Sequence, residues 1–248
     1  MIAKGDSESD PLPTGVEAVV LAGGLGARLR SVVSDRPKPM ALVSGRPFLE
    51  WLLSDLRNQG IERIILSTGH MSEFIEDYFG SGDAFGLEIV YSREDAPLGT
   101  GGAIKLALSK LHGQRFFALN GDSFCDFNLG RMLEAHLEKA AAATLWLVPV
   151  DESERFGAVN VNANREIIGF REKSEVGQGG LINAGVYLLQ RSVLDSMPAN
   201  AAFSLERDMF PGLIGRGIFG MIGSGPFIDI GTPESYGMAD LFINRRKV

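Results

Sequence analysis

Cysteine is almost missing from this sequence. Cys125 is the only one in 248 residues, which excludes an internal disulfide and fits a reducing compartment. Hard metal ions bind oxygen ligands in preference to thiolates, so Cys125 is not expected to be a metal ligand. We expect it to pack in the interior. The three histidines share no metal-ligand spacing and are expected to be surface or packing residues. These absences favour the cytoplasm.

Long hydrophobic runs are also missing. One of the longest, AAAATLWLVPV over residues 140–150, is too short to span a bilayer, which predicts no membrane segment. The opening MIAKGDSESDPLPTG has no apolar stretch of the kind found in secretory signals. Its small, acidic and proline residues predict a disordered arm over residues 1–15.

An excess of positive charge is absent as well. The formal net charge is -7, which argues against broad nucleic-acid binding because that needs a basic surface that releases counterions. An anionic ligand would therefore need local positive charge. Four cations meet this need within eleven residues: Arg28, Arg30, Arg36 and Lys38.

What the sequence does contain, up to Val150, is an alternation of strand-like and helix-like segments. Near-continuous apolar runs predict strands at 17–23, 63–69, 87–92, 115–122 and 143–150. Helical periodicity predicts helices at 47–60, 72–80, 101–111 and 129–142, with Ser72 as the N-cap of the second. This alternation predicts an α/β fold with a mostly parallel, Rossmann-like sheet and helices on both faces. Ligands of such sheets bind outside the carboxyl ends of the strands.

After Val150 the pattern changes. Residues 157–173 read as a hairpin, 180–190 as a strand, and 204–217 as a segment that contains a helix. Two short strands follow at 218–223 and 226–231. A closing helix at 232–246 has Thr232 as N-cap and Pro233 in its first turn. We place a boundary near Val150, between parts 16–150 and 151–248.

The first strand runs into the glycine-rich segment LAGGLGARLRSVVSDRPKPM, residues 21–40. Glycines at this position let backbone N–H groups approach a phosphate. The segment lacks the lysine spacing of a Walker A loop, and Leu29 stands where a dinucleotide-binding loop has its third glycine. A plain strand-to-loop turn is an equally good reading of the glycines alone. Lys38 shifts the balance towards a ligand contact, because Pro37 and Pro39 stiffen its backbone.

Two aspartates lie at the ends of predicted strands, Asp122 in NGD and Asp229 in FIDIG. Each one alone is most simply a turn residue. If they converge, two carboxylates form a site for a hard cation, and Mg²⁺ needs few protein ligands when phosphates supply the others.

Together these motifs resemble the sugar-1-phosphate nucleotidyltransferases. That family carries L-A-G-G-x-G-[TS]-R-L followed by P-K-P, and Ala27 here replaces its Thr or Ser. Further matching motifs appear in the family's order up to about Arg246: PLGTGGA, LNGDS, RFGAV, REKS, NAGVYL and FIDIGTPESY. The resemblance implies attack of a sugar 1-phosphate on the α-phosphorus of a nucleoside triphosphate, with release of pyrophosphate. It also implies a smaller sugar-binding lobe, formed by the second part of the same domain.

The resemblance assigns roles residue by residue. Arg28 and Lys38 would be catalytic, and Asp122 and Asp229 would hold Mg²⁺. Nucleotide contacts would come from Leu21, Ala22, Gly23, Gly24, Gly26, Glu94, Gly99 and Asp122. Sugar-phosphate contacts would come from Gly157, Glu172, Lys173 and Asn183. Taken alone, the REKS segment would be a solvated charge run.

The base and the sugar are harder to predict. A carboxylate at Glu94 can accept hydrogen bonds from guanine N1–H and N2–H₂ together, which favours GTP, and a solvated loop acid is the alternative interpretation. LRSVVSDRPKPMA and SLERDMFP are most similar to the branch of the family that acts on a heptose 1-phosphate with GTP. Mannose 1-phosphate with GTP, a hexose 1-phosphate with UTP, and a non-enzymatic nucleotide-sugar sensor are the alternatives. A glycosyltransferase is disfavoured because GDSFCD lacks a clustered D-x-D. The sequence leaves a homodimer open.

Overall fold

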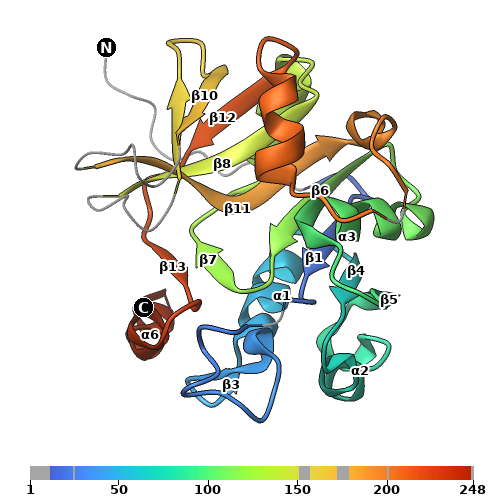
Figure 1. Ribbon diagram of the computed structural model, residues 1–248, viewed down its shortest axis with the longest axis vertical. Coiled ribbons are helices and arrows are strands. Elements are labelled where there is room, and N and C mark those ends of the chain that lie inside the picture. The colour runs from blue at the N-terminus through green and yellow to red at the C-terminus, as the bar shows by residue number, and fades with distance from the viewer. Residues whose placement is uncertain (1–11, 25, 151–156, 172–178, 200, 247–248) are drawn as a thin grey trace.

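The computed structural model describes residues 12–24, 26–150, 157–171, 179–199 and 201–246. Most of the predicted arm, residues 1–11, lies outside these ranges. A sheet of nine strands forms the centre of the structure, in the order β10-β9-β11-β6-β1-β4-β5, with β8 beside β11 and β12 beside β8 (Figure 1).

The parallel part of the sheet consists of β1 (Glu17–Leu21), β4 (Arg63–Thr68), β5 (Glu88–Arg93) and β6 (Arg115–Asn120). All four strands were predicted from apolar runs, and this part of the prediction is confirmed. Leu21 at the end of β1 lies opposite Ser67 of β4 and Asn120 of β6. The loops that follow these strands therefore leave the sheet at one common edge.

Helices cover both faces of the sheet, as predicted. Ala18 and Val20 of β1 belong to one hydrophobic cluster, whereas Val19 between them belongs to the other. The first cluster takes apolar residues from α1 (Phe48–Asn58), α2 (Ser72–Phe79) and α4 (Leu129–Glu138). The second takes Ile104 and Ala107 from α3 (Gly99–Ala107). This alternation follows from the two-residue period of a strand.

The sheet continues past Val150 with antiparallel strands. β8 (Ala143–Val150) and β11 (Gly180–Gln190) are antiparallel neighbours, and β11 also pairs antiparallel with β6. The predicted hairpin is formed by β9 (Ala158–Val161) and β10 (Ile167–Arg171). β12 (Ile218–Ile222) runs parallel to β8. Strands from both predicted parts of the chain therefore share one mixed sheet.

Two small ribbons lie outside the main sheet. β2 (Leu42–Val43) pairs with β3 (Arg46–Pro47), and β7 (Ser123–Cys125) pairs antiparallel with β13 (Phe227–Asp229). Cys125 is fully buried in this second ribbon, as expected for a packing residue. Short 3₁₀ turns occupy Lys38–Met40, Asp83–Phe85, Leu108–Lys110 and Arg191–Leu194.

Three local predictions need correction. Residues 204–217 hold only a π-helical turn, Leu205–Met209, and a 3₁₀ turn, Phe210–Leu213, because Pro211 cannot donate a helical hydrogen bond. The closing helix is two helices, α5 (Pro233–Gly237) and α6 (Ala239–Arg246). Ser72 does not cap α2, because Met71 occupies the N-cap position in a left-handed conformation. Thr232 does cap α5, since its hydroxyl accepts from the Ser235 N–H.

No helix in the described ranges is both long enough and apolar enough to cross a membrane.

Candidate active site

The glycine-rich loop leaves the sheet edge after β1 and folds back over Lys38. A Cβ on Gly26, whose φ is +59°, would lie 2.9 Å from Cβ of Lys38, so only glycine permits this approach. A Cβ on Gly23 would lie 2.8 Å from Oε1 of Glu94. Leu29 anchors the loop in the core, with 1% of its surface exposed. The two glycines therefore serve close packing between this loop and two predicted site residues.

Lys38 lies between the two strand-end aspartates. Its Nζ is 2.6 Å from Oδ2 of Asp122 and 3.9 Å from Oδ2 of Asp229. The side chain is 10% exposed, because it begins a 3₁₀ turn whose next residue, Pro39, is buried. The ammonium group thus lies between two carboxylates at a largely solvent-excluded position, where charges interact more strongly than in water.

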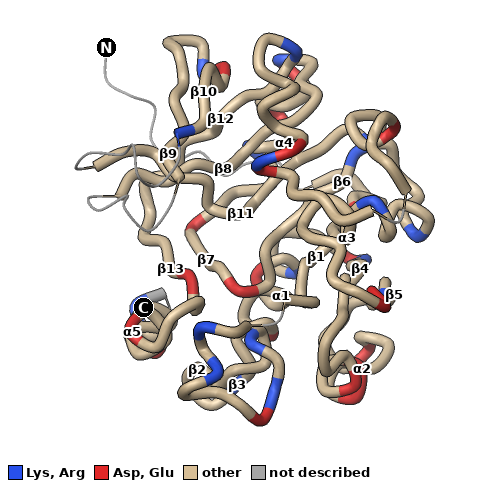
Figure 2. Tube along the Cα trace, in the orientation of Figure 1, with Lys and Arg blue, Asp and Glu red and all other residues tan. Residues whose placement is uncertain are grey.

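The ribbon of β7 and β13 brings the two aspartates together. Asp229 lies opposite Ser123, the residue after Asp122. The Ser123 hydroxyl is 3.3 Å from Oδ1 of Asp122 and 3.4 Å from Oδ2 of Asp229. The backbone N–H of Gly231 donates to Oδ1 of Asp229 over 2.8 Å, which orients that carboxylate. Figure 2 shows acidic segments at β7 and β13 near basic segments of the loop beside β2 and β3.

Arg28 completes the charged group. It lines a pocket of about 250 Å³ together with Lys38, Asp122 and the glycine-rich loop. Within the part of the chain that the structure describes, no carboxylate pairs with Arg28, although Asp35 pairs with Arg36 at 2.7 Å. An exposed guanidinium without an acidic partner, at a pocket wall, is well suited to an anion. Arg28, Lys38, Asp122 and Asp229 therefore converge, and their catalytic roles stay predictions.

A second pocket, of about 270 Å³, joins the first at Leu21, Gly24 and Asp122. Gly23, Glu94 and Gly99 also line it, as the nucleotide assignment requires. Ala22 does not line either pocket, because it is buried and its N–H donates to Ser67 O of β4. Thr100 and Asn120 line the second pocket without having been assigned a role from the sequence.

Glu94 is half-buried between this pocket and a neighbouring one of about 490 Å³. Its Oε2 accepts from the backbone N–H of Leu98 over 2.7 Å. Burial raises the pKa of the Glu94 carboxyl above its usual value, and the hydrogen bond from Leu98 opposes that shift. Removing water from a carboxylate disfavours its charged form, so a ligand with N–H donors would restabilise it.

The predicted sugar-phosphate residues are only partly placed. Glu172 and Lys173 lie outside the described residues. Gly157 is exposed at the start of β9. Asn183 lies on β11, where its Nδ2 donates to the Tyr187 hydroxyl and its Oδ1 accepts from Gly185 N–H. It does not line the two pockets at the glycine-rich loop.

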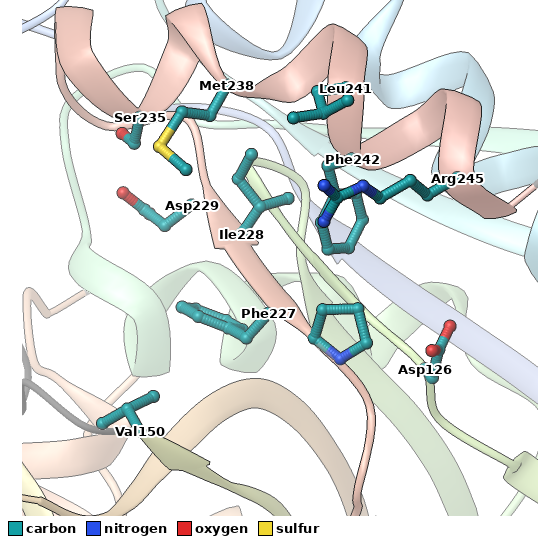
Figure 3. Close-up of a pocket in the computed structure, with 11 residues that line it drawn as sticks. Asp126, Val150, Phe227, Ile228, Asp229, Ser235, Met238, Leu241, Phe242 and Arg245 are labelled. Atoms are coloured by element: carbon teal, nitrogen blue, oxygen red, sulfur yellow. The ribbon is translucent and has the colours of Figure 1, made fainter.

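A larger cavity, of about 670 Å³, lies on the other side of β13. Figure 3 shows Phe227 and Ile228 of β13 facing Leu241 and Phe242 of α6 across it. Its lining is mostly apolar, with Asp126 and Arg245 as charged residues besides Asp229. Arg28 and Lys38 line the pocket at the glycine-rich loop and do not line this larger cavity. The larger cavity is therefore less suited to an anionic ligand, although its volume is greater.

The two aspartates fit a magnesium ion. No group of three or more His, Cys, Asp or Glu side chains that could hold a metal occurs among the described residues. Two carboxylates that approach the same ammonium group nevertheless offer the hard oxygen ligands that Mg²⁺ prefers. A pair suffices where phosphate oxygens and waters complete the shell.

The ends of the parallel strands and the ribbon of β7 and β13 bring a glycine-rich loop, two cations and two carboxylates together, an arrangement of an α/β enzyme that suits a phosphate-bearing ligand. The sequence model of nucleotidyl transferases matches residues 17–246, and the chain belongs to this family.

Relatives with known names support this membership. The chain is 42% identical to D-glycero-alpha-D-manno-heptose 1-phosphate guanylyltransferase of Aneurinibacillus thermoaerophilus, over 89% of this chain and 95% of that protein. It is 40% identical to mannose-1-phosphate guanylyltransferase of Mycobacterium tuberculosis, over 91% of this chain and 64% of that protein.

A solved structure has the same fold. HddC from Yersinia pseudotuberculosis complexed with GMP-PN superposes with a TM-score of 0.81 and 34% identity, over 92% of this chain and 99% of that one.

Proposed function

We propose that this protein transfers GMP from GTP to D-glycero-α-D-manno-heptose 1-phosphate and releases pyrophosphate. Two relatives that carry the name of this activity are 42% and 38% identical, and the match covers 95% and 97% of their lengths. The observation that carries the proposal is the convergence of Arg28 and Lys38 with the paired carboxylates of Asp122 and Asp229.

The chemical problem in this reaction is charge. A sugar 1-phosphate and a nucleoside triphosphate repel each other, and the attacking phosphate oxygen is already ionised at neutral pH. The protein therefore needs cations and fixed positions rather than a strong base. Lys38 would hold the two phosphoryl groups together, and Arg28 would brace the pyrophosphate as it leaves.

Asp122 fixes where the Lys38 ammonium group lies. The ammonium group contacts that carboxylate at the wall of the pocket that Arg28 also lines. Asp122 and Asp229 would hold Mg²⁺, which when bound neutralises phosphate charge and orients phosphate oxygens. Lys38 and Arg28 would hold phosphate oxygens from the wall of the pocket that they share.

Glu94 supports GTP as the nucleotide. Its Oε2 is held by the Leu98 N–H, and its Oε1 lies beside Gly23 at the pocket that Gly99 also lines. Guanine offers two N–H donors on one edge, which match the two oxygens of a carboxylate. Uracil and thymine offer only one.

Mannose 1-phosphate is the second candidate for the sugar substrate. The Mycobacterium tuberculosis relative named for that substrate is nearly as similar, at 40% identity. The sugar would be selected by residues of the second part, among them Gly157, Asn183 and, outside the described residues, Glu172 and Lys173. The nucleotide sugar would serve the synthesis of a cell-surface polysaccharide, and the reaction would take place in the cytoplasm.

A substrate screen tests the proposal. The protein is incubated with Mg²⁺, each of the four nucleoside triphosphates and a panel of sugar 1-phosphates, and the released pyrophosphate is measured. We expect release with GTP and the heptose 1-phosphate. Release of pyrophosphate with mannose 1-phosphate alone would make mannose 1-phosphate the sugar substrate. Release with UTP alone would contradict the assignment of Glu94 to guanine. No release with any pair would favour a non-enzymatic sensor.

A further inference from the structure

Glu206 is the centre of a hydrogen-bond network and has no role in the reaction proposed above. Its Oε1 accepts from the Tyr187 hydroxyl over 2.9 Å. Its Oε2 accepts from the hydroxyls of Thr100, over 2.8 Å, and Ser204, over 2.6 Å. The three donors come from β11, from the first turn of α3 and from the residue before the π-helical turn. One carboxylate thus joins its own turn to β11 and to α3.

Each of the three hydroxyls also accepts a hydrogen bond from an N–H group. Asn183 Nδ2 donates to Tyr187, the backbone of Leu205 donates to Thr100, and the backbone of Arg207 donates to Ser204. An N–H group can only donate, and an ionised carboxylate can only accept. The direction of every hydrogen bond in the network is therefore fixed. Each hydroxyl accepts from an N–H group and donates its own proton to Glu206.

This directionality orients the amide of Asn183. Because the Tyr187 proton points to Glu206, the phenol oxygen presents a lone pair to Asn183 and selects Nδ2 on that side. The amide oxygen then faces Gly185 N–H, which donates to it over 3.0 Å. Burial and the nearby charge of Glu206 raise the pKa of Tyr187 well above its usual value, so the phenol keeps its proton. Glu206, acting through Tyr187, and the Gly185 N–H therefore fix together how Asn183 is turned, although Glu206 does not need to contact Asn183.

The other arm of the network reaches the nucleotide pocket. Thr100 lines the pocket that contains Glu94 and Gly99. Its position is reinforced by the backbone of Phe203, whose carbonyl accepts from Gly101 N–H over 3.0 Å and whose N–H donates to Leu98 O over 3.0 Å. Leu98 in turn holds Glu94. The segment with Glu206 therefore packs against the loop that lines the pocket.

We propose that Glu206 is a positioning residue that orients Asn183 for the sugar 1-phosphate and Thr100 for the nucleotide. The inference rests on the proposed function, because Asn183 is assigned to the sugar side only by resemblance. It gives Glu206 no contact with the reacting atoms. Glu206 acts on each substrate through a different hydroxyl, that of Tyr187 on the sugar side and that of Thr100 on the nucleotide side. Each connection can therefore be removed by a separate substitution.

Three conservative variants separate the arms. Tyr187→Phe removes the hydroxyl between Glu206 and Asn183 and leaves Thr100 in place. Thr100→Val removes the other arm. Glu206→Gln affects at least one arm, because its amide group places a donor opposite a hydroxyl that already accepts from an N–H group. Asp208→Asn is the matched control, since Asp208 lies on the same turn and its Oδ2 accepts from the Ser204 N–H rather than from one of the three hydroxyls.

Steady-state kinetics with both substrates provide the measurement. We expect Tyr187→Phe to raise KM for the sugar 1-phosphate about tenfold, the effect of losing one oriented hydrogen bond, with KM for the triphosphate within about twofold. Thr100→Val should show the reverse split, and Glu206→Gln should raise at least one of the two KM values. Asp208→Asn should leave both unchanged.

A structural role alone would not produce this split. Thermal unfolding of each variant is measured in parallel, and equal changes in both KM values for Tyr187→Phe and Thr100→Val, following the loss of stability, would overturn the proposal. Unchanged kinetics in Glu206→Gln would overturn it as well. If the wild-type protein turns over no substrate pair, the proposed function is wrong. If the wild-type protein is active and the variants have the same kinetics, the proposed function stands and only the role of Glu206 is wrong.

Discussion

At the scale of the residue, Lys38 is the predicted catalytic residue whose place the structure of this nucleotidyl transferase defines most closely. Its ammonium group is nearly enclosed and is held between Asp122 and Asp229. Such a charge is positioned before the substrate arrives, so no reorganisation is needed during the reaction. The sequence marked it through the flanking prolines, and the structure adds that Gly26 packs directly on its Cβ.

Replacement of Lys38 tests this reading. We expect Lys38→Ala to lower kcat on the order of 10²–10³, the effect of removing one preorganised charge at the site of charge development. Pyrophosphate release under saturating substrates is the measurement. Lys139→Ala, at an exposed position after α4, is the control. Equal activity in the two variants would remove Lys38 from the mechanism.

Glu94 leads to a prediction about pH. Burial raises the pKa of its carboxyl, so the group gains a proton at a higher pH than an exposed glutamate does. The charged form accepts from guanine, and GTP affinity should therefore fall as pH is lowered through the raised pKa. We expect Glu94→Gln to bind GTP about 10–100-fold more weakly at neutral pH, as for a lost hydrogen bond to a charged group.

Calorimetric titration of GTP across acidic and neutral pH measures both effects. The variant should lose the part of the pH dependence that belongs to Glu94, while the part due to the phosphates of GTP remains in both proteins. Parallel pH profiles for the two proteins would show that Glu94 does not contact the base.

At the scale of the element, β13 and α5 determine where Asp229 lies. β13 pairs with β7, two residues then form a turn, and Thr232 begins α5 with a capping box shared with Ser235. The cap satisfies backbone N–H groups that the first helical turn leaves without partners. A local cap therefore helps to hold a strand that carries a site residue.

We expect Thr232→Ala to lower the free energy of unfolding by about 1 kcal/mol, the usual effect of losing a side-chain N-cap. Urea denaturation gives the value. Thr232→Ser keeps the hydroxyl and should remain close to the wild-type protein. A loss of the same size in the serine variant would show that the methyl group, rather than the cap, matters at this position.

At the scale of the whole molecule, the sheet unites the two parts that the sequence analysis divided near Val150. β6 from the first part pairs with β11 from the second, and β8 pairs with both β11 and β12. The assignment of separate nucleotide and sugar parts stays a prediction, and so does a homodimer.

This pairing predicts that the first part does not fold alone. A fragment of residues 12–150 would expose the edges of β6 and β8 together with apolar side chains that now pack in one cluster with β11, among them Phe116 and Leu145. We expect the fragment to lack cooperative thermal unfolding by circular dichroism. The full chain should unfold in one transition, and two separate transitions would contradict this expectation.

Much of this protein can be predicted from its sequence alone. The parallel strands, the helices between them and the cap at Thr232 depend on side-chain periodicity and on residues a few positions apart, and such local preferences act wherever the segment lies. The glycine-rich loop with Lys38 could be found for the same reason, because proline and glycine restrict or free the backbone at their own positions.

Only the tertiary structure decided which of these residues meet. Ser123 and Asp229 are 106 residues apart, and nothing local requires β7 and β13 to pair. Glu206 stands in a segment predicted to contain a helix, yet it holds β11 and α3 together because Pro211 ends its turn early and three hydroxyls converge on it. Convergence of this kind depends on the packing of the whole sheet and its covering helices, which no single stretch of sequence specifies.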